Sequence, residues 1–216
     1  MNGSLKIGTF YGIPIQLHWT FLIIIPLFAW IIGSQISLTA DMIKEIFLVP
    51  LDTSLMTEGY IPYIVGIIVA LGLFAGVLLH ELAHSLVARY KGIRINSITL
   101  MIFGGIASME EGVPDPKAEL PMALIGPITS LVVGLVCSGM VYAVPTLISN
   151  PAASGIWIFV FGYLGILNII LCAFNLQPAF PMDGGRVLRA WLATRMPLYR
   201  ATKIPADIGK GFAIIF

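Results

Sequence analysis

Long apolar runs dominate the chain and determine the elements that it predicts. Four runs, at about residues 19–36, 62–88, 120–147 and 157–174, have the length of about 20 residues that a membrane-spanning helix needs. A short helix is expected at 186–195, and a last apolar stretch starts near residue 204 and is still running at Phe216. The pattern predicts an all-α polytopic membrane protein, a bundle of about six transmembrane helices.

Two segments interrupt this helical pattern. Residues 93–109 (IRINSITLMIFGGIASM) are rich in β-branched side chains and contain the pair Gly104-Gly105. This composition predicts a small membrane-associated strand or hairpin with a turn near the glycine pair. Residues 37–60 carry five charged side chains, so they are expected to form a loop at the membrane interface.

Composition narrows the class of protein. Hydrophobic residues make up 58% of the 216 residues and charged residues 11%, whereas a soluble domain has about 45–50% and about 25%. A soluble globular protein is therefore excluded. The formal net charge is +1, which leaves no positive field to hold a nucleic acid.

The cations are distributed unequally about the predicted spans. Lys44 lies on one side and Lys210 in the last apolar stretch. The others all fall on the side shared with the N-terminus: Lys6, Arg89, Lys91, Arg94, Lys117, Arg186, Arg189, Arg195, Arg200 and Lys203. Because Lys and Arg accumulate in cytoplasmic loops, we expect a multi-pass protein of the cell membrane with a cytoplasmic N-terminus.

The second apolar run contains the sequence HELAH at residues 80–84. On a helix, His80 and His84 share one face and can offer two imidazole nitrogens to one zinc ion, with Glu81 placed to activate water. Glu81 lies eight residues before Arg89, which puts it about 12 Å into the membrane. Ionisable groups are costly there unless they are paired or bound to metal. The HELAH pattern favours a metal centre over a set of structural hydrogen bonds. His18 lies beside Trp19, before the first apolar run, so we expect it to be an interfacial anchor and not a metal ligand.

Two histidines require at least one more protein ligand for zinc. Asp183 follows the fourth apolar run in NLQPAFPMDGG (175–185), and irregular backbone of this kind could return to present a carboxylate to a neighbouring helix. In the same segment Asn175 could donate to an oxyanion, although a helix C-cap and a surface turn explain these residues equally well. A solvated connection is the simpler explanation for the other nearby carboxylates, Glu110, Glu111, Asp115 and Glu119.

Taken together, these motifs resemble the site-2 protease family of intramembrane zinc metalloproteases. HELAH lies within one apolar run, and FNLQPAFPMDGG (174–185) ends another, with Met182 where many members have leucine. The segments YGIPIQLHW (11–19), FGG (103–105) and GPITS (126–130) are similar to further parts of the family. The chain looks most like an archaeal site-2 protease transmembrane core.

The resemblance implies that residues 1–216 are a single transmembrane protease core. One zinc ion per chain would be bound by His80, His84 and Asp183, with Glu81 as general base on zinc-activated water and Asn175 stabilising the oxyanion. The substrate would be a transmembrane helix of another protein in the lipid bilayer, cleaved near the cytoplasmic side in regulated intramembrane proteolysis. The 93–109 segment would hold the unwound peptide. Some members carry C-terminal nucleotide-binding CBS domains, which would fit a chain that stops inside a helix.

Other functions remain open at this point. A membrane protein that transports or senses zinc without hydrolysis needs polar ligands along the whole bundle, whereas the sequence offers one compact cluster. A purely structural membrane subunit would bind no stoichiometric zinc. A serine-type intramembrane protease is disfavoured because the sequence contains no Gly-x-Ser-x-Gly pattern.

Overall fold

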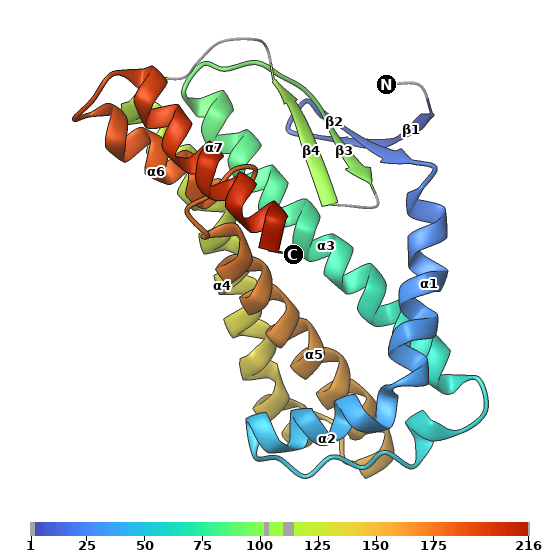
Figure 1. Ribbon diagram of the computed structural model, residues 1–216. Coiled ribbons are helices and arrows are strands. Elements are labelled where there is room, and N and C mark those ends of the chain that lie inside the picture. The colour runs from blue at the N-terminus through green and yellow to red at the C-terminus, as the bar shows by residue number, and fades with distance from the viewer. Residues whose placement is uncertain (1–2, 102–103, 110–114, 216) are drawn as a thin grey trace.

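The computed structural model describes residues 3–101, 104–109 and 115–215, and it places a helical bundle beside one small sheet (Figure 1). The strands are β1 (Ser4–Phe10), β2 (Ile13–His18), β3 (Ile95–Met101) and β4 (Gly104–Met109). The helices are α1 (Phe21–Ser34), α2 (Ile36–Phe47), a 3₁₀ turn η1 (Leu55–Thr57), α3 (Ile61–Tyr90), α4 (Pro116–Leu147), α5 (Pro151–Asn175), α6 (Asp183–Ala193) and α7 (Leu198–Ile215).

Three helices of the described chain, α3, α4 and α5, are long and apolar enough to cross a membrane. The pair α1 and α2, bent by 72° at Gln35, passes the same test as one broken span. The expected count of about six spans is therefore not confirmed, since the described residues give three or four. The short helix expected at 186–195 is present as α6, which has 11 residues. The apolar stretch expected from residue 204 is part of α7, which begins earlier, at Leu198, and is amphipathic, with charges at Arg200, Lys203, Asp207 and Lys210.

The bundle is built around α3, α4 and α5. Helices α4 and α5 form an antiparallel hairpin that packs on one side of α3, while α1 packs on the other side (Figure 1). The core draws side chains of 0% exposure from four helices, among them Ile43, Val69, Val141 and Phe159. Because lipid is as apolar as these side chains, close packing rather than removal from water holds such helices together.

Local signals in the sequence explain where α5 begins and where α3 ends. At the start of α5, the Asn150 side chain accepts a hydrogen bond from the Ala153 N–H, and Pro151 occupies the first turn. At the end of α3, Gly92 has a φ of +83° and Ile93 N–H bonds the Ala88 carbonyl. That geometry is a Schellman cap, which favours glycine.

The sheet has the order β1-β2-β3-β4 and lies at one end of the bundle, beside α3 (Figure 1). Strands β3 and β4 are antiparallel, so the hairpin predicted over 93–109 is confirmed. Gly104 and Gly105 are the first residues of β4, so the chain reverses direction next to the glycine pair, as predicted. Phe103, also part of the family resemblance, lies outside the described residues.

The hairpin of β1 and β2 was not predicted. Its β2 strand pairs in parallel with β3 at Ile15–Ile98, and the sheet packs on α3 where Ile13 and Ile98 contact Leu82. Alternating apolar and polar residues at 13–18 and the Tyr11-Gly12 pair were the available signals. The sheet therefore fixes the N-terminal segment against the helix that bears HELAH.

The segment 37–60, expected to be an interfacial loop, contains α2 and η1. In α2 the buried side chains are Ile36, Ala40, Ile43 and Phe47, which lie three to four residues apart on one helix face. The charged residues of α2, Asp41, Lys44 and Glu45, alternate with this apolar face. The prediction of a loop is therefore wrong, because the charged residues interrupt the apolar spacing that marks this helix.

Two valines on α4 test whether packing within the bundle stabilises the fold. Val141 is fully buried, whereas Val136 is 61% exposed on the outer face. We expect Val141→Ala to lower the free energy of unfolding by about 1–2 kcal/mol, because it leaves a cavity among tightly packed neighbours. Val136→Ala should change it by less than about 0.5 kcal/mol. Denaturant unfolding in detergent micelles measures both, and equal losses would contradict this description of the core.

Candidate metal centre

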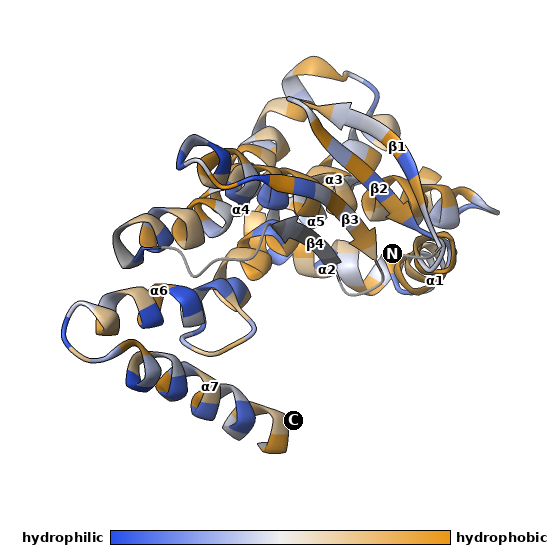
Figure 2. Ribbon diagram, turned by 90° about the horizontal axis from the view of Figure 1, so that it is seen from above, coloured by the Kyte–Doolittle hydropathy of each residue, from blue (hydrophilic) through white to orange (hydrophobic). Residues whose placement is uncertain are grey.

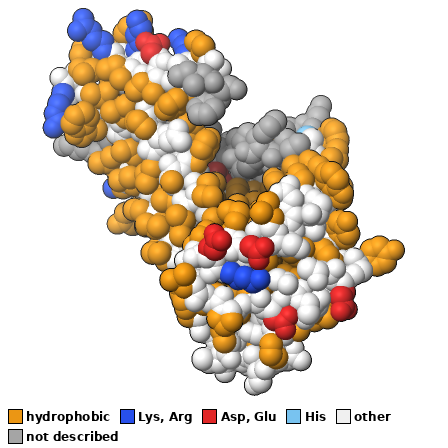
Figure 3. Space-filling model, turned by 60° about the horizontal axis from the view of Figure 1, so that its bottom comes forward, with side chains coloured by type: hydrophobic (Ala, Val, Ile, Leu, Met, Phe, Trp, Pro, Cys, Tyr) orange, Lys and Arg blue, Asp and Glu red, His pale blue; other side chains and the backbone are white. Residues whose placement is uncertain are grey.

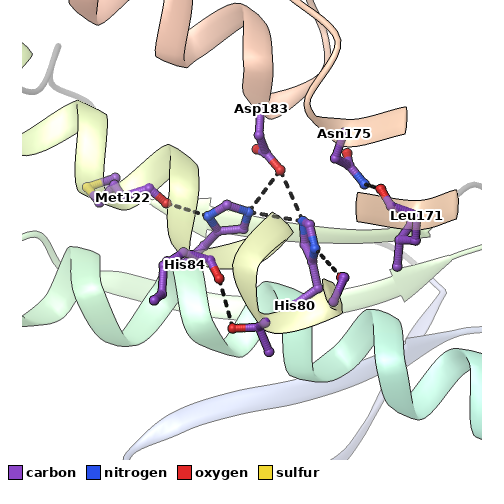
Figure 4. A network of polar contacts seen from close by, with 9 residues as sticks. His80, His84, Met122, Leu171, Asn175 and Asp183 are labelled. Carbon is purple, nitrogen blue, oxygen red and sulfur yellow. Dashed lines mark hydrogen bonds and ion pairs between the residues drawn. The ribbon is translucent and has the colours of Figure 1, made fainter. Parts of the chain in front are cut away.

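Three side chains from two helices converge in the interior of the molecule (Figure 4). His80 and His84 lie one turn apart on α3, and Asp183 is the first residue of α6. The two Nε2 atoms are 3.1 Å apart, and each lies 3.0 Å from Oδ2 of Asp183. All three side chains are buried. The structure thus joins residues about a hundred positions apart in sequence into one group that could hold a metal ion.

The outer nitrogens of both imidazoles are held by α4. His84 Nδ1 lies 2.6 Å from the Met122 carbonyl oxygen, and His80 Nδ1 lies 2.9 Å from the Ser130 hydroxyl. A carbonyl only accepts hydrogen bonds, so Nδ1 of His84 carries a proton and its Nε2 turns a lone pair inward. A histidine that ligates a metal typically has such a partner on its other nitrogen.

The donor set fits a zinc ion. The Ser130 hydroxyl can accept a hydrogen bond from Nδ1–H of His80. With Nδ1 protonated on both rings, the three facing atoms all carry lone pairs, and a shared cation relieves their repulsion. Zinc bonds of about 2.0–2.2 Å in a tetrahedron place neighbouring ligand atoms about 3.3–3.6 Å apart, slightly more than the 3.0 and 3.1 Å separations here. Three protein ligands of this kind leave a fourth position for water or substrate.

The sequence predicted that Asp183 lies in an irregular loop, and this prediction is wrong. The irregular part is 176–182, and Asp183 begins helix α6 immediately after it. Burial alone would raise the pKa of the Asp183 carboxyl, but the adjacent imidazoles of His80 and His84 hold that pKa well below its usual range. The carboxylate therefore stays anionic, as a metal ligand must be.

Glu81 lies beside this group, towards the sheet. Its side chain packs against Gly105, where an added Cβ would overlap the Glu81 side chain. Strand β4, which contains Gly105, is a terminal strand of the sheet. The carboxyl group of Glu81 is thus positioned between α3 and the β4 edge.

Asn175 lies at the last turn of α5, next to the loop that leads to Asp183. Its Nδ2 donates to the Leu171 carbonyl at 2.9 Å, and Figure 4 shows the amide turned towards Leu171. The structure brings Asn175 near the metal group while engaging one amide hydrogen in its own helix.

One further carboxylate, that of Glu119, does not lie where the sequence predicts. Glu119 was expected in a solvated connection, yet it is 2% exposed in α4 and forms an ion pair with Arg189 of α6. Arg189 Nε lies 3.2 Å from Glu119 Oε2. Asp115 is exposed before α4, whereas Glu110 and Glu111 lie outside the described residues. The Glu119–Arg189 pair ties α4 to the helix that begins with Asp183.

His18 is not part of the metal group. Its Nδ1 lies 2.9 Å from the Thr20 hydroxyl, at the point where β2 leads into α1. This agrees with the expectation that His18 does not ligate the metal.

A stripe on α4 supports the histidines, and sequence reasoning did not assign it. Met122, Gly126 and Ser130 are spaced four residues apart, so they share the helix face that meets α3. A Cβ at Gly126 would overlap the His84 ring, so only glycine lets α4 approach so closely. The Gly126-to-Ser130 spacing in GPITS was the available signal.

The family model, the curated relatives and the solved structure that match this chain all indicate the same family. The family model described as Peptidase family M50 matches residues 68–148 and 137–216. A zinc metalloprotease of Methanocaldococcus jannaschii is 35% identical over 216 residues, which is 100% of this chain and 53% of that protein. The solved structure of the site-2 protease from Methanocaldococcus jannaschii has a TM-score of 0.58 and 34% identity, covering 98% of this chain and 82% of that one. The chain spans about half the length of the curated relative that it matches.

The Ser130 hydroxyl provides a test of the support from α4. We expect Ser130→Ala to weaken zinc binding by about 10–100-fold, because His80 loses the partner that orients its ring. Thr129→Val is the matched control, since the Thr129 hydroxyl donates to the Ile125 carbonyl of its own helix. Zinc titration of metal-free protein against a chelating dye measures both. Equal affinities for the two variants would show that Ser130 does not orient His80.

Proposed function

Because this chain belongs to peptidase family M50, we propose that it is the core of a site-2-type zinc metalloprotease that cleaves other membrane proteins in or near their spanning segments. The observation that supports this most is the convergence of His80, His84 and Asp183 within a group of helices apolar enough to cross a membrane. Relatives that match the chain are named zinc metalloproteases. A hydrolytic site inside a bundle implies a substrate that reaches it from the membrane.

His80, His84 and Asp183 would hold the zinc ion. When bound, zinc supplies Lewis-acid chemistry that activates water and polarises a carbonyl. Glu81, one residue from His80 and facing the β4 edge, would take the proton from the attacking water and pass it to the leaving amine. A positioned carboxylate in this role contributes about 10²–10⁴-fold to the rate.

Asn175 would stabilise the oxyanion of the tetrahedral intermediate. A side-chain amide has two N–H donors, and one of them is engaged with the Leu171 carbonyl. That hydrogen bond fixes the amide, so its second N–H can be aimed at the developing charge. Oriented donors of this kind stabilise a transition state more than they stabilise the substrate.

Strand β4 would hold the substrate. A helical substrate hides its carbonyls in intrahelical hydrogen bonds, so it must unwind before attack. The described sheet ends at β4 on the side of Glu81, and an extended peptide can add to such an edge as a further strand. This arrangement would bring a scissile carbonyl to Glu81 and the metal group.

The distribution of charge supports an orientation with the N-terminus in the cytoplasm. In Figure 3 the Lys and Arg side chains gather at the end formed by α6 and α7, whereas Asp and Glu predominate at the α2 end. The metal group lies at the α6 end of the bundle, so the positive-inside rule would place it nearer the cytoplasmic face. Water and cleaved products would exchange on that side.

A Glu81→Gln variant tests hydrolysis against zinc transport or sensing. We expect cleavage of a membrane-embedded substrate to fall by about 10²–10⁴-fold, because the general base is lost, while zinc affinity stays unchanged. Asp183→Asn is the contrasting variant and should lose stoichiometric zinc as well. Reconstituted cleavage assays and metal analysis give both values. Undiminished cleavage by Glu81→Gln would exclude Glu81 as the base.

Cysteine cross-linking tests the placement of the substrate. Ser108 on β4 and Thr9 on β1 are both exposed, and they lie on the two terminal strands of the sheet. With Cys137 and Cys172 replaced by alanine, Ser108→Cys should form a disulfide with a substrate cysteine near the cleavage position about tenfold faster than Thr9→Cys, because a bound peptide raises the local thiol concentration. Equal rates for the two positions would contradict substrate binding along β4.

A further inference from the structure

The segment 176–182 leads directly to Asp183, the first residue of α6. Helix α7 contacts this segment through the backbone of Phe180. Phe180 N–H donates to the Pro205 carbonyl of α7 at 3.1 Å. The Phe180 carbonyl lies directly against Gly209, where an added Cβ would overlap the carbonyl oxygen. Both backbone polar groups of Phe180 therefore face α7, three residues before the proposed metal ligand.

These contacts come from one face of α7. Ala201, Pro205 and Gly209 are spaced four residues apart, so they share a face. Ala201 is 0% exposed and Pro205 is fully buried, although α7 lies at the margin of the molecule beside α6 (Figure 2). The buried face is small, and it is directed at α6 and the segment that leads to Asp183.

The ring of Phe180 is held from a second direction. The guanidinium carbon of Arg189 lies 5.4 Å from the ring centroid, within the range of a cation–π contact. Arg189 is in turn paired with Glu119 of α4, the helix that orients both histidines. Phe180 thus connects α7 to the same framework that fixes His80 and His84.

We propose that α7 is a positioning element for the metal site, in which the face of Ala201, Pro205 and Gly209 holds Phe180 and thereby sets the place of the Asp183 carboxylate. Gly209 is the positioning residue, because only a residue without a side chain admits the Phe180 carbonyl. The proposal rests on the proposed binding of zinc by His80, His84 and Asp183. If α7 positions Asp183 in this way, the affinity for zinc depends on the packing of α7, a helix at the edge of the molecule that provides no metal ligand.

The first experiment compares two glycines of α7 in the full chain. A Cβ at Gly211 meets nothing within 4 Å, so Gly211→Ala should leave zinc affinity unchanged and, by helix propensity, not destabilise α7. Gly209→Ala should weaken zinc binding by about tenfold or more, as loss of support around a ligand does. The absorption spectrum of cobalt-substituted Gly209→Ala should differ from that of the wild-type protein, whereas the spectrum of cobalt-substituted Gly211→Ala should match it. Equal zinc affinity and identical spectra for the two alanine variants would overturn the proposal.

The second experiment needs no substitution and covers the case in which Gly209→Ala fails to fold. Coupling between two sites is reciprocal, so if α7 docking sets zinc affinity, zinc must stabilise the docking. In the wild-type protein, zinc should slow amide hydrogen exchange over residues 201–209 by about fivefold or more, and leave α2 (Ile36–Phe47) unchanged. Zinc that binds at one ion per chain without slowing exchange in α7 would refute this inference alone, whereas absence of zinc binding would refute the proposed function.

Discussion

The structure depends on three acceptor atoms that face one another in a bundle of apolar helices. Nε2 of His80, Nε2 of His84 and Oδ2 of Asp183 lie within 3.1 Å of each other. Such a group is unfavourable in an apolar interior unless a cation joins it. The surrounding contacts can be understood as the means by which the fold holds these atoms together: α4 fixes both imidazoles, and α6 and α7 fix the carboxylate.

The supporting contacts show why glycines recur around the site. Gly126 lets α4 reach the His84 ring, and Gly105 lets β4 reach Glu81. In a membrane protein, small residues of this kind allow helices to pack closely where hydrophobic driving force is absent. In the same way, glycines allow α4, with its oriented carbonyl and hydroxyl, to approach one side of HELAH and the terminal strand β4 to approach the other.

Part of this arrangement could be predicted from the sequence. The HELAH spacing places two imidazoles on one helix face because helix geometry is local, and the apolar runs identify α3, α4 and α5. Asp183 could not be chosen over Glu119 by spacing alone, because both the pairing of Glu119 with Arg189 and the approach of Asp183 to α3 arise from tertiary packing. The β1–β2 hairpin escaped prediction because its parallel partner β3 follows about eighty residues later. The charges in α2 obscure the spacing of its one buried face. Helix α7 was expected from residue 204 as an apolar stretch, whereas it begins at Leu198 and is amphipathic.

We propose that this chain holds one zinc ion through two imidazoles and a carboxylate. Zinc X-ray absorption of the purified protein tests it most directly. We expect one zinc ion per chain, with two imidazole nitrogens at about 2.0–2.1 Å and carboxylate or water oxygens at about 2.0–2.2 Å. A protein without zinc, or a zinc shell that lacks imidazole, would contradict it.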